Sequence, residues 1–208
     1  MQALRKYGDP EYWNKRYSTA SGTFDWYFEY HPFIAQILDG FNSKEISILD
    51  VGCGNSKFSE ILVSKGYKKI TCIDYSKAFF EHLFQEFHER LPSVHYMYMD
   101  ARMLSFPEAS FDVVFDKGLL DSALTGELSY VNAKQIIKSC LRVLKPFGKY
   151  IIISHSDMET RKEHFLDPSF DCELRCESIV VTDNDCHEGE ERLPDLTFYA
   201  YIFSKHLH

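Results

Sequence analysis

The sequence predicts an α/β fold built on a mostly parallel sheet, from two observations. Short apolar runs rich in β-branched residues alternate with segments of helical periodicity between residues 46 and 154. Strand-like stretches at 174–181 and 196–203 then follow with no amphipathic helix between them, and they bracket an acidic loop at 183–195. A hairpin-like pair of strands is therefore expected to finish the sheet.

Length and composition indicate one domain over residues 1–208. The chain has 208 residues, of which 45% are hydrophobic and 15% aromatic, enough for a sizeable core. It has no apolar run of about 18 residues and no charged-then-apolar leader, so we expect neither a membrane span nor a secretory signal. Six cysteines fall mostly inside strand or helix patterns, which favours reduced thiols and a cytoplasmic protein. The net charge of -8 makes a nucleic-acid partner unlikely on electrostatic grounds.

The first expected element is a short helix that begins with Asp9 as its cap and Pro10 in its first turn. Trp13 and Tyr17, four residues apart, share a face of this helix, and residues 24–28 add a second aromatic cluster. Such pairs are most often core. Because the segment precedes the strand–helix units, we expect its rings to cover part of them.

The remaining elements follow in chain order. The patterns predict a helix at 32–38, a strand from 46, a helix from Phe58 to Gly66, a strand at 69–74, a longer helix capped by Ser76 and running through Phe87, strands at 94–99 and 111–115, a helix at 131–144 broken by Pro146 and Gly148, and a strand at 149–154.

The glycine turn after the first strand indicates a nucleoside site. Gly52 can adopt backbone angles closed to other residues, and Gly54 lets a ligand approach the main chain. Lys57 stands where a dinucleotide fingerprint needs its third glycine. Asp50 ends the first strand and suits a cationic ligand, while Asp74 ends the second and suits ribose hydroxyls. A cationic nucleoside indicates S-adenosylmethionine.

Four motifs then make a family resemblance specific: Asp-Val-Gly-Cys-Gly-Asn-Ser at 50–56, Ile-Asp-Tyr-Ser at 73–76, Met-Asp-Ala-Arg at 99–102, and Phe-Asp-Val-Val-Phe-Asp-Lys-Gly-Leu-Leu-Asp at 111–121. With these the chain resembles the class I S-adenosylmethionine-dependent methyltransferases over nearly its whole length. The resemblance implies a doubly wound, seven-stranded, mostly parallel Rossmann-like sheet with an antiparallel last strand. The cofactor contacts expected in the core are Asp50, Gly52, Gly54, Asp74, Tyr75, Asp100, Ala101 and Lys117.

The N-terminal segment carries a second, narrower resemblance. Glu-Tyr-Trp-Asn-Lys-Arg-Tyr at 11–17, followed by Asp25 and Trp26, resembles the opening of the elongation factor 1A lysine methyltransferases. It implies that residues 1–28 lie over the cofactor, that Trp13, Tyr17 and Trp26 contact it, and that residues 29–208 form the core. It also implies a protein substrate such as elongation factor 1A, methylated on a lysine.

The chemistry expected of the site is an in-line displacement, in which the protein aligns donor and acceptor and excludes water. A lysine amine attacks only after losing its proton, so carboxylates near the methyl group would assist. Asp116 and Asp121 flank the loop where the resemblance places the acceptor, and they are the predicted catalytic residues. The alternative for them is local: Asp116 hydrogen-bonds nearby and Asp121 caps a helix.

Other readings remain open. A small-molecule methyltransferase would need a lid, for which the chain offers the N-terminal segment; a catalytically silent cofactor-binding protein is conceivable because Ser56 replaces the usual third glycine of the methyltransferase loop. The Asn/Asp-Pro-Pro-aromatic turn of base-modifying enzymes is absent. No metal site is expected, since the spacings of Cys172 and Cys176 with His155, His164 or the pair Cys186-His187 match no compact zinc motif.

Overall fold

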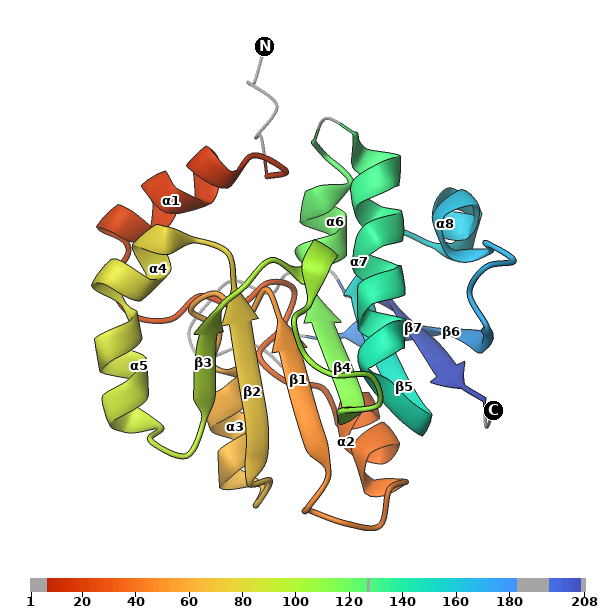
Figure 1. Cartoon of the computed structure of the whole chain (residues 1–208), viewed down its shortest axis with the longest axis horizontal. Helices are drawn as coiled ribbons and strands as arrows, with labels where there is room; N and C mark the ends of the chain where they lie inside the picture. The colour runs from red at the N-terminus through yellow and green to blue at the C-terminus, as the bar shows by residue number, and fades with distance from the viewer. Residues whose placement is uncertain (1–6, 127, 183–194, 207–208) are drawn as a thin grey trace.

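The structure, a computed structural model, describes residues 7–126, 128–182 and 195–206, and within them seven strands form one sheet. The strands lie in the order β3-β2-β1-β4-β5-β7-β6 (Figure 1). Their bounds are β1 (Ser47–Val51), β2 (Lys69–Asp74), β3 (His95–Tyr98), β4 (Phe111–Lys117), β5 (Leu144–Ser154), β6 (Cys172–Val181) and β7 (Leu196–Lys205).

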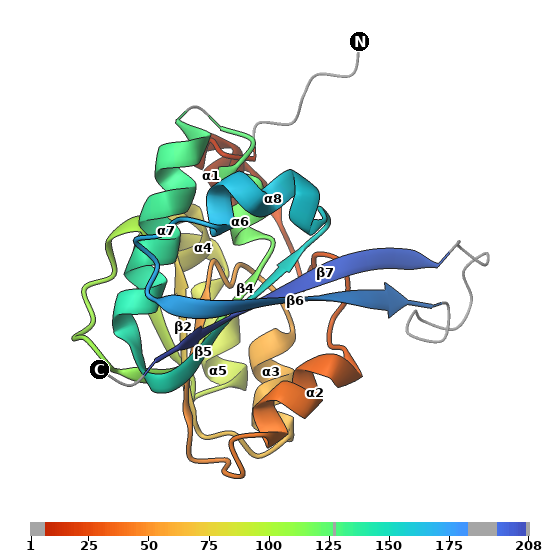
Figure 2. The ribbon, with the colours of Figure 1, turned by 90° about the vertical axis from the view of Figure 1, so that its right-hand side faces the viewer.

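The directions of the strands confirm the predicted sheet. Strands β1 to β5 pair in parallel with their neighbours, whereas β7 runs antiparallel to both β5 and β6. The last strand in the chain is therefore inserted between two strands of the opposite direction. Figure 2 shows β6 and β7 leaving the body of the molecule as a long ribbon. Of the expected acidic loop that joins them, residues 183–194 lie outside the described part of the chain.

Helices lie on both sides of the sheet, as a doubly wound fold requires (Figures 1 and 2). Their bounds are α1 (Pro10–Thr19), α2 (Pro32–Asp39), α3 (Phe58–Ser64), α4 (Lys77–His82), α5 (Phe84–Arg90), the 3₁₀ turn η1 (Ala101–Met103), α6 (Leu119–Ala123), α7 (Ser129–Val143) and α8 (Met158–Phe165). Asp9 and Ser76 cap α1 and α4 through side-chain oxygens, as predicted.

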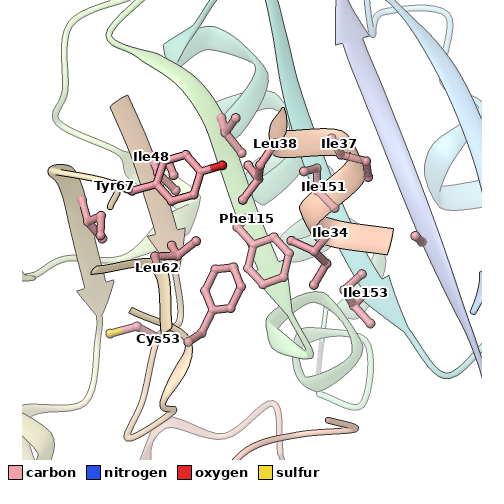
Figure 3. Packing of buried hydrophobic residues seen from close by; sticks show 14 of the residues in the cluster. Ile34, Ile37, Leu38, Ile48, Cys53, Leu62, Tyr67, Phe115, Ile151 and Ile153 are labelled. Atoms are coloured by element: carbon pink, nitrogen blue, oxygen red, sulfur yellow. The ribbon is translucent and has the colours of Figure 1, made fainter. Parts of the chain in front are cut away.

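The core is divided by the sheet into two apolar clusters. Consecutive residues of a strand point to opposite faces, so Ile48 and Leu49 of β1 belong to different clusters, as do Ile151 and Ile152 of β5. Figure 3 shows the first cluster, in which α2 meets β4 and β5. There Phe115 of β4 stacks on the ring of Phe58 with centroids 4.0 Å apart. This packing fixes the carboxyl ends of the central strands.

Several elements differ from the prediction. The long helix expected from Ser76 to Phe87 is two helices, because the chain turns at Leu83, where φ is -114°. β5 begins at Leu144 and includes the segment that was expected to break a helix. Neither α6 nor α8 was given bounds from the sequence, because α6 has only five residues and the eight residues of α8 carry almost no apolar face.

The N-terminal segment crosses the edge of the sheet where the parallel strands end (Figure 1). Trp13 and Tyr17 are buried, and they pack with α4 and α5 in a third cluster around Phe79 and Phe87. Within the described residues no helix is long and apolar enough to cross a membrane.

Candidate functional site

The candidate site lies at the carboxyl ends of β1, β2 and β4. Strand order reverses at β1, because β2 lies on one side of it and β4 on the other. In open α/β sheets ligands bind in the crevice at such a switch point. The glycine turn after β1 and the turn after β4 both open into this crevice, and the N-terminal segment covers it.

The glycine turn has the backbone geometry that the sequence predicts. Gly52 and Gly54 have φ values of 67° and 50°, in the left-handed region that side chains rarely adopt. A Cβ on Gly54 would collide with the hydroxyl of Tyr17, and one on Gly52 would lie 2.9 Å from Leu119 Cβ. The missing side chains therefore let Tyr17 of α1 and Leu119 of α6 pack directly against the turn.

Asp74 holds this turn from the neighbouring strand. Its carboxylate accepts hydrogen bonds from the N–H of Gly54 at 3.0 Å and of Ser76 at 2.8 Å. Burial raises the pKa of Asp74 to about 6, although these bonds oppose the shift. Burial also raises the pKa of Asp50 to about 8, against the lowering effect of Lys117. The site thus contains two desolvated carboxyl groups that a cation would help to ionise.

The N-terminal segment is tied to both sides of the crevice. Asn14 Oδ1 accepts hydrogen bonds from Ser76 Oγ at 2.9 Å and from Ala78 N at 3.3 Å, next to β2. At the other side, the carbonyl of Tyr7 accepts a hydrogen bond from Ser122 Oγ of α6 at 2.6 Å. The segment from Tyr7 to Asn14 therefore bridges the two walls of the site.

Asp25 joins the same segment to the glycine turn and to β4. Its carboxylate accepts from Ser56 Oγ at 2.5 Å, from Lys57 N at 3.1 Å and from Lys117 Nζ at 2.5 Å. Lys117 also donates to the carbonyl of Phe28 at 2.6 Å. Burial lowers the pKa of Lys117, and the paired Asp25 opposes that shift. Ser56, which stands where the methyltransferase loop usually has a glycine, thus donates one of the hydrogen bonds that Asp25 accepts.

Two adjoining hollows occupy the crevice. The first, of about 630 Å³, lies between the N-terminal aromatic rings and the glycine turn; the second, of about 550 Å³, lies toward η1 and α7. Both are lined by Gly52, Asp74 and Tyr75. The first also has Trp13, Tyr17, Trp26, Asp50, Gly54 and Lys117 in its walls, and the second has Asp100 and Ala101. All the residues expected to contact the cofactor therefore meet in one elongated cleft.

Asp116 is fully buried and lies outside the residues that line either hollow. It accepts hydrogen bonds from Leu119 N at 2.9 Å, Leu120 N at 3.3 Å and Tyr150 Oη at 3.2 Å. Burial raises the pKa of Asp116 to about 7 despite these donors. The carboxylate caps the start of α6, which is the local role that the sequence left open for it.

Asp121 is also buried and also outside the lining of the hollows. Its carboxylate accepts from Tyr27 Oη at 2.7 Å, Ser154 Oγ at 2.7 Å, His155 N at 2.9 Å and Arg161 Nη2 at 2.6 Å, and lies 2.6 Å from His155 Nδ1. Burial alone would raise the pKa of Asp121. Hydrogen bonds from His155 and Tyr27 and the charge of Arg161 outweigh it and hold that pKa well below the usual range. Asp121 thus orients neighbours instead of capping a helix.

Several residues of the site were missed or left without a role by sequence reasoning. Each of them contacts a partner that lies 31 to 94 residues away in the chain. These residues are Asn14, Asp25, Tyr27, His155 and Arg161. Asp25 and Tyr27 did carry a signal, because a carboxylate and a phenol inside an aromatic cluster need partners when buried. His155 carried none, since it follows a strand like many loop residues.

Among the described residues, no group of three His, Cys, Asp or Glu side chains is placed to hold a metal ion. Cys172 and Cys176 are free thiols there. Cys186 and His187, which entered the metal alternative, lie outside the described residues.

Comparison with known proteins gives a consistent picture. A family model described as a methyltransferase domain matches residues 49–152. The eEF1A lysine and N-terminal methyltransferase of Mus musculus is 30% identical over 210 residues, which cover 98% of this chain and 30% of that protein. EEF1A lysine methyltransferase 4 of Mus musculus is 33% identical over 180 residues, covering 82% of this chain and 70% of that one. The chain thus spans under a third of the first relative and over two thirds of the second.

Solved structures share the fold at lower identity. An S-adenosylmethionine-dependent methyltransferase from Methanosarcina mazei is similar with a TM-score of 0.61 and 21% identity, over 87% of this chain and 100% of that one. The N-methyltransferase NodS from Bradyrhizobium japonicum, solved with S-adenosyl-l-homocysteine, has a TM-score of 0.61 and 18% identity, over 97% and 99% of the two chains.

Proposed function

The chain belongs to the methyltransferase domain family, and we propose that it transfers a methyl group from S-adenosylmethionine to a lysine side chain of a protein, with elongation factor 1A as the substrate. S-adenosylmethionine is the cofactor, and when bound it supplies a methyl group on a positively charged sulfur. The observation that supports the lysine acceptor is the 33% identity over 82% of the chain with a protein named for that activity on elongation factor 1A.

The residues of the cleft fit this cofactor. We assign Asp74 to the ribose hydroxyls, from which its carboxylate would accept hydrogen bonds, and Asp50 to the positive charge of the ligand; both are buried and line the first hollow. Asp100 and Ala101 line the second hollow, where we place the adenine. The two glycines let Tyr17 and Leu119 approach the main chain of the turn, so that both side chains stand in the wall of the first hollow. Binding and orientation therefore come from one side of the cleft.

The opposite wall is aromatic, and we assign it to water exclusion. Trp26 packs against Gly118, where a Cβ would lie 3.3 Å from its ring, so the indole closes on the turn after β4. Trp13 stacks on Tyr17 with centroids 5.8 Å apart. An apolar wall of this kind holds the reacting groups together in the absence of competing water.

For Asp116 and Asp121 we propose an indirect contribution to turnover. Asp116 fixes the turn that carries Lys117 and Gly118 into the cleft wall. Asp121 places a negative charge behind that wall, where it favours the approach of a cationic lysine. Free thiols at the five described cysteines are consistent with a cytoplasmic location, which we also propose.

The test is transfer of label from S-adenosylmethionine to purified elongation factor 1A. We expect one labelled product, a modified lysine by mass spectrometry, and loss of the label when that lysine is changed to arginine. The matched control is Asp74→Ala, which should lose transfer through weaker cofactor binding. Cofactor binding with no transfer to elongation factor 1A or to any protein of a cytosolic extract would reject the proposal.

A second acceptor is suggested by one relative, whose name includes N-terminal methylation. An α-amino group differs from a lysine amine in that its pKa lies near 8, so a larger share is neutral at pH 7. If the label were found on the N-terminal residue, this second candidate would replace the first.

A further inference from the structure

His155 is held in an unusual way beside the aromatic wall. It follows β5, and its side chain is 58% exposed while its partner Asp121 is 3% exposed. Nδ1 lies 2.6 Å from Asp121 Oδ2, and the main-chain N–H of His155 donates to the same oxygen at 2.9 Å. The imidazole is thus held at Nδ1 by a buried carboxylate, although more than half of the His155 side chain is exposed.

Tyr27, which also contacts Asp121, has a strained backbone conformation. Tyr27 has a φ of 66°, which is rare for a bulky side chain and is found where surrounding contacts impose it. The imposing contacts are a tight turn closed by Phe28 N on the carbonyl of Trp26 at 2.7 Å, and the hydrogen bond from Tyr27 Oη to Asp121. The ring packs on Phe198 with centroids 4.8 Å apart and lies 6.4 Å from that of His155.

These contacts connect His155 to both segments that line the cleft. Tyr27 directly follows Trp26, and Asp121 directly precedes Ser122, and both of those neighbours are in the cleft wall. His155 itself lines neither hollow. It is one ring removed from the cleft wall, because the ring of Tyr27 lies 6.4 Å from that of His155 and 5.7 Å from that of Trp26. An acceptor lysine that enters beside Trp26 would therefore come near this group.

We propose that His155 is the proton acceptor for the substrate lysine, with Asp121 and Tyr27 as positioning residues. This rests on the proposed function. The ionised carboxylate of Asp121 requires a proton on Nδ1, which leaves the Nε2 lone pair free. Nε2 takes one proton from the lysine ammonium, giving imidazolium and a neutral amine. The amine's lone pair then forms the new N–C bond as the S–C bond breaks, and the exposed imidazolium returns its proton to water.

The charges around His155 suit this role. The hydrogen bond to Asp121 raises the pKa of His155, and partial burial and the charge of Arg161 oppose that shift only in part. Arg161 of α8 is buried and donates to Asp121 Oδ1, so the carboxylate keeps its charge while the imidazole titrates. Burial raises the pKa of Tyr27, which keeps its phenol a hydrogen-bond donor near neutral pH. The groups that face His155 from α6, α8 and the N-terminal segment are thus Asp121, Arg161 and Tyr27.

The first test compares His155→Gln with His95→Gln, an exposed histidine of β3 at the far edge of the sheet. We expect His155→Gln to lower kcat for the lysine acceptor at pH 7 by about 100-fold, a typical loss for a proton-transfer group. Cofactor affinity should be unchanged. The loss should shrink as pH rises, because the lysine then reaches the site already neutral. Added imidazole should restore turnover to His155→Ala, whereas His95→Gln should behave as wild type.

The second test needs no turnover. Nitrogen NMR of the imidazoles should find His155 protonated at Nδ1, with a raised pKa that Asp121→Asn abolishes. If His155→Gln kept wild-type kcat at pH 7 in an enzyme that methylates lysine, the inference would be wrong and the proposed function would stand. An unprotonated Nδ1 would also overturn it. If wild type methylated no lysine, both would be rejected together.

Discussion

The buried carboxylates at the carboxyl ends of the strands differ in what their surroundings leave free. Asp50 and Asp74 line the cleft, and burial raises their pKa values to about 8 and about 6. Asp116 and Asp121 line neither hollow, and each has several donors on its oxygens. The first two carboxylates therefore face the space that a ligand would occupy. The second two form hydrogen bonds that hold neighbouring elements together.

At Asp74 we expect the largest single effect on cofactor binding. Asp74→Ala removes the acceptor of the Gly54 and Ser76 N–H groups and the proposed acceptor of the ribose hydroxyls. The free energy of binding S-adenosylmethionine should weaken by about 1.5–3 kcal/mol, roughly a 10- to 150-fold loss of affinity. Titration calorimetry measures this, with the exposed Asp39→Ala as the control. Equal affinities for the two variants would remove Asp74 from the site.

At Asp116 we expect an effect on stability. Asp116→Ala leaves the N–H groups of Leu119 and Leu120 and the hydroxyl of Tyr150 without their acceptor. Unfolding in urea should show a loss of about 1–3 kcal/mol. The surface change Glu108→Gln should leave stability unaltered. A variant of normal stability with a low kcat would instead support the catalytic role predicted from the sequence.

At the scale of elements, the determining feature is how α1 is held. A ten-residue helix is marginal in water by itself, so its order depends on what it packs against. Here its aromatic face packs on α4, its middle is tied to Ser76 through Asn14, and the residue Tyr7 that precedes it is tied to Ser122. A ligand in the cleft would add contacts to the same face. Helix and cofactor should therefore stabilise each other.

Asn14→Ala tests that coupling without touching the aromatic wall. It removes the acceptor of Ser76 Oγ and Ala78 N, and we expect cofactor affinity to drop by about fivefold to thirtyfold, or 1–2 kcal/mol. Lys15→Ala, an exposed change on the same helix, should have no effect. Hydrogen exchange should show slower exchange of the α1 amides with S-adenosylmethionine in wild type. Equal exchange rates with and without the cofactor would mean that α1 is ordinary core.

For the whole molecule, the sheet topology determines where charge collects. Parallel strands end at one edge, so the carboxyl ends of β1, β2 and β4 bring Asp50, Asp74 and Asp116 into the same region. These groups are desolvated there. In addition, the charges of Asp116 and Asp74 raise the pKa of Asp50, and the charge of Asp121 raises the pKa of Asp116. A cationic cofactor relieves this repulsion.

The stability of the cofactor-free protein should therefore fall as pH rises from about 4 to about 8. The raised folded-state pKa values of Asp50 and Asp116 mean that the native state keeps protons that the unfolded chain has released. Each group then lowers the free energy of unfolding by at most about 1.4 kcal/mol per pH unit within its window. The lowered pKa of Asp121 has the opposite sign, but its contribution is complete above pH 4 or so.

Urea unfolding at about pH 5.5 and about pH 8 measures this slope. Asp50→Asn should make the slope shallower, and saturating S-adenosylmethionine should reduce it because a cation favours the ionised carboxylates. A stability that increased over this range would contradict the assignment of raised pKa values.

By itself the sequence determined the sheet and one wall of the site. Period-two and period-3.6 patterns are local, so the strands, the glycine turn and the acidic residues that end β1 and β2 could be predicted from short stretches. The positions of Gly52, Gly54 and Asp74 in the cleft follow from that pattern, because parallel strands must end at a common edge. The break at Leu83 and the start of β5 at Leu144 were not predictable, since packing outweighed weak local preferences there.

The tertiary structure alone decided what the polar side chains do. Asp121 could be read from the chain as a helix cap or as an acceptor-site carboxylate, and its partners Tyr27, Ser154 and Arg161 lie 33 to 94 residues away. No local pattern encodes such a set, because a hydrogen bond depends on positions within a few tenths of an ångström that only the assembled fold provides. The same holds for Asp25 on Lys117, 92 residues apart. Pattern determines which elements form, and packing determines which of their charges meet.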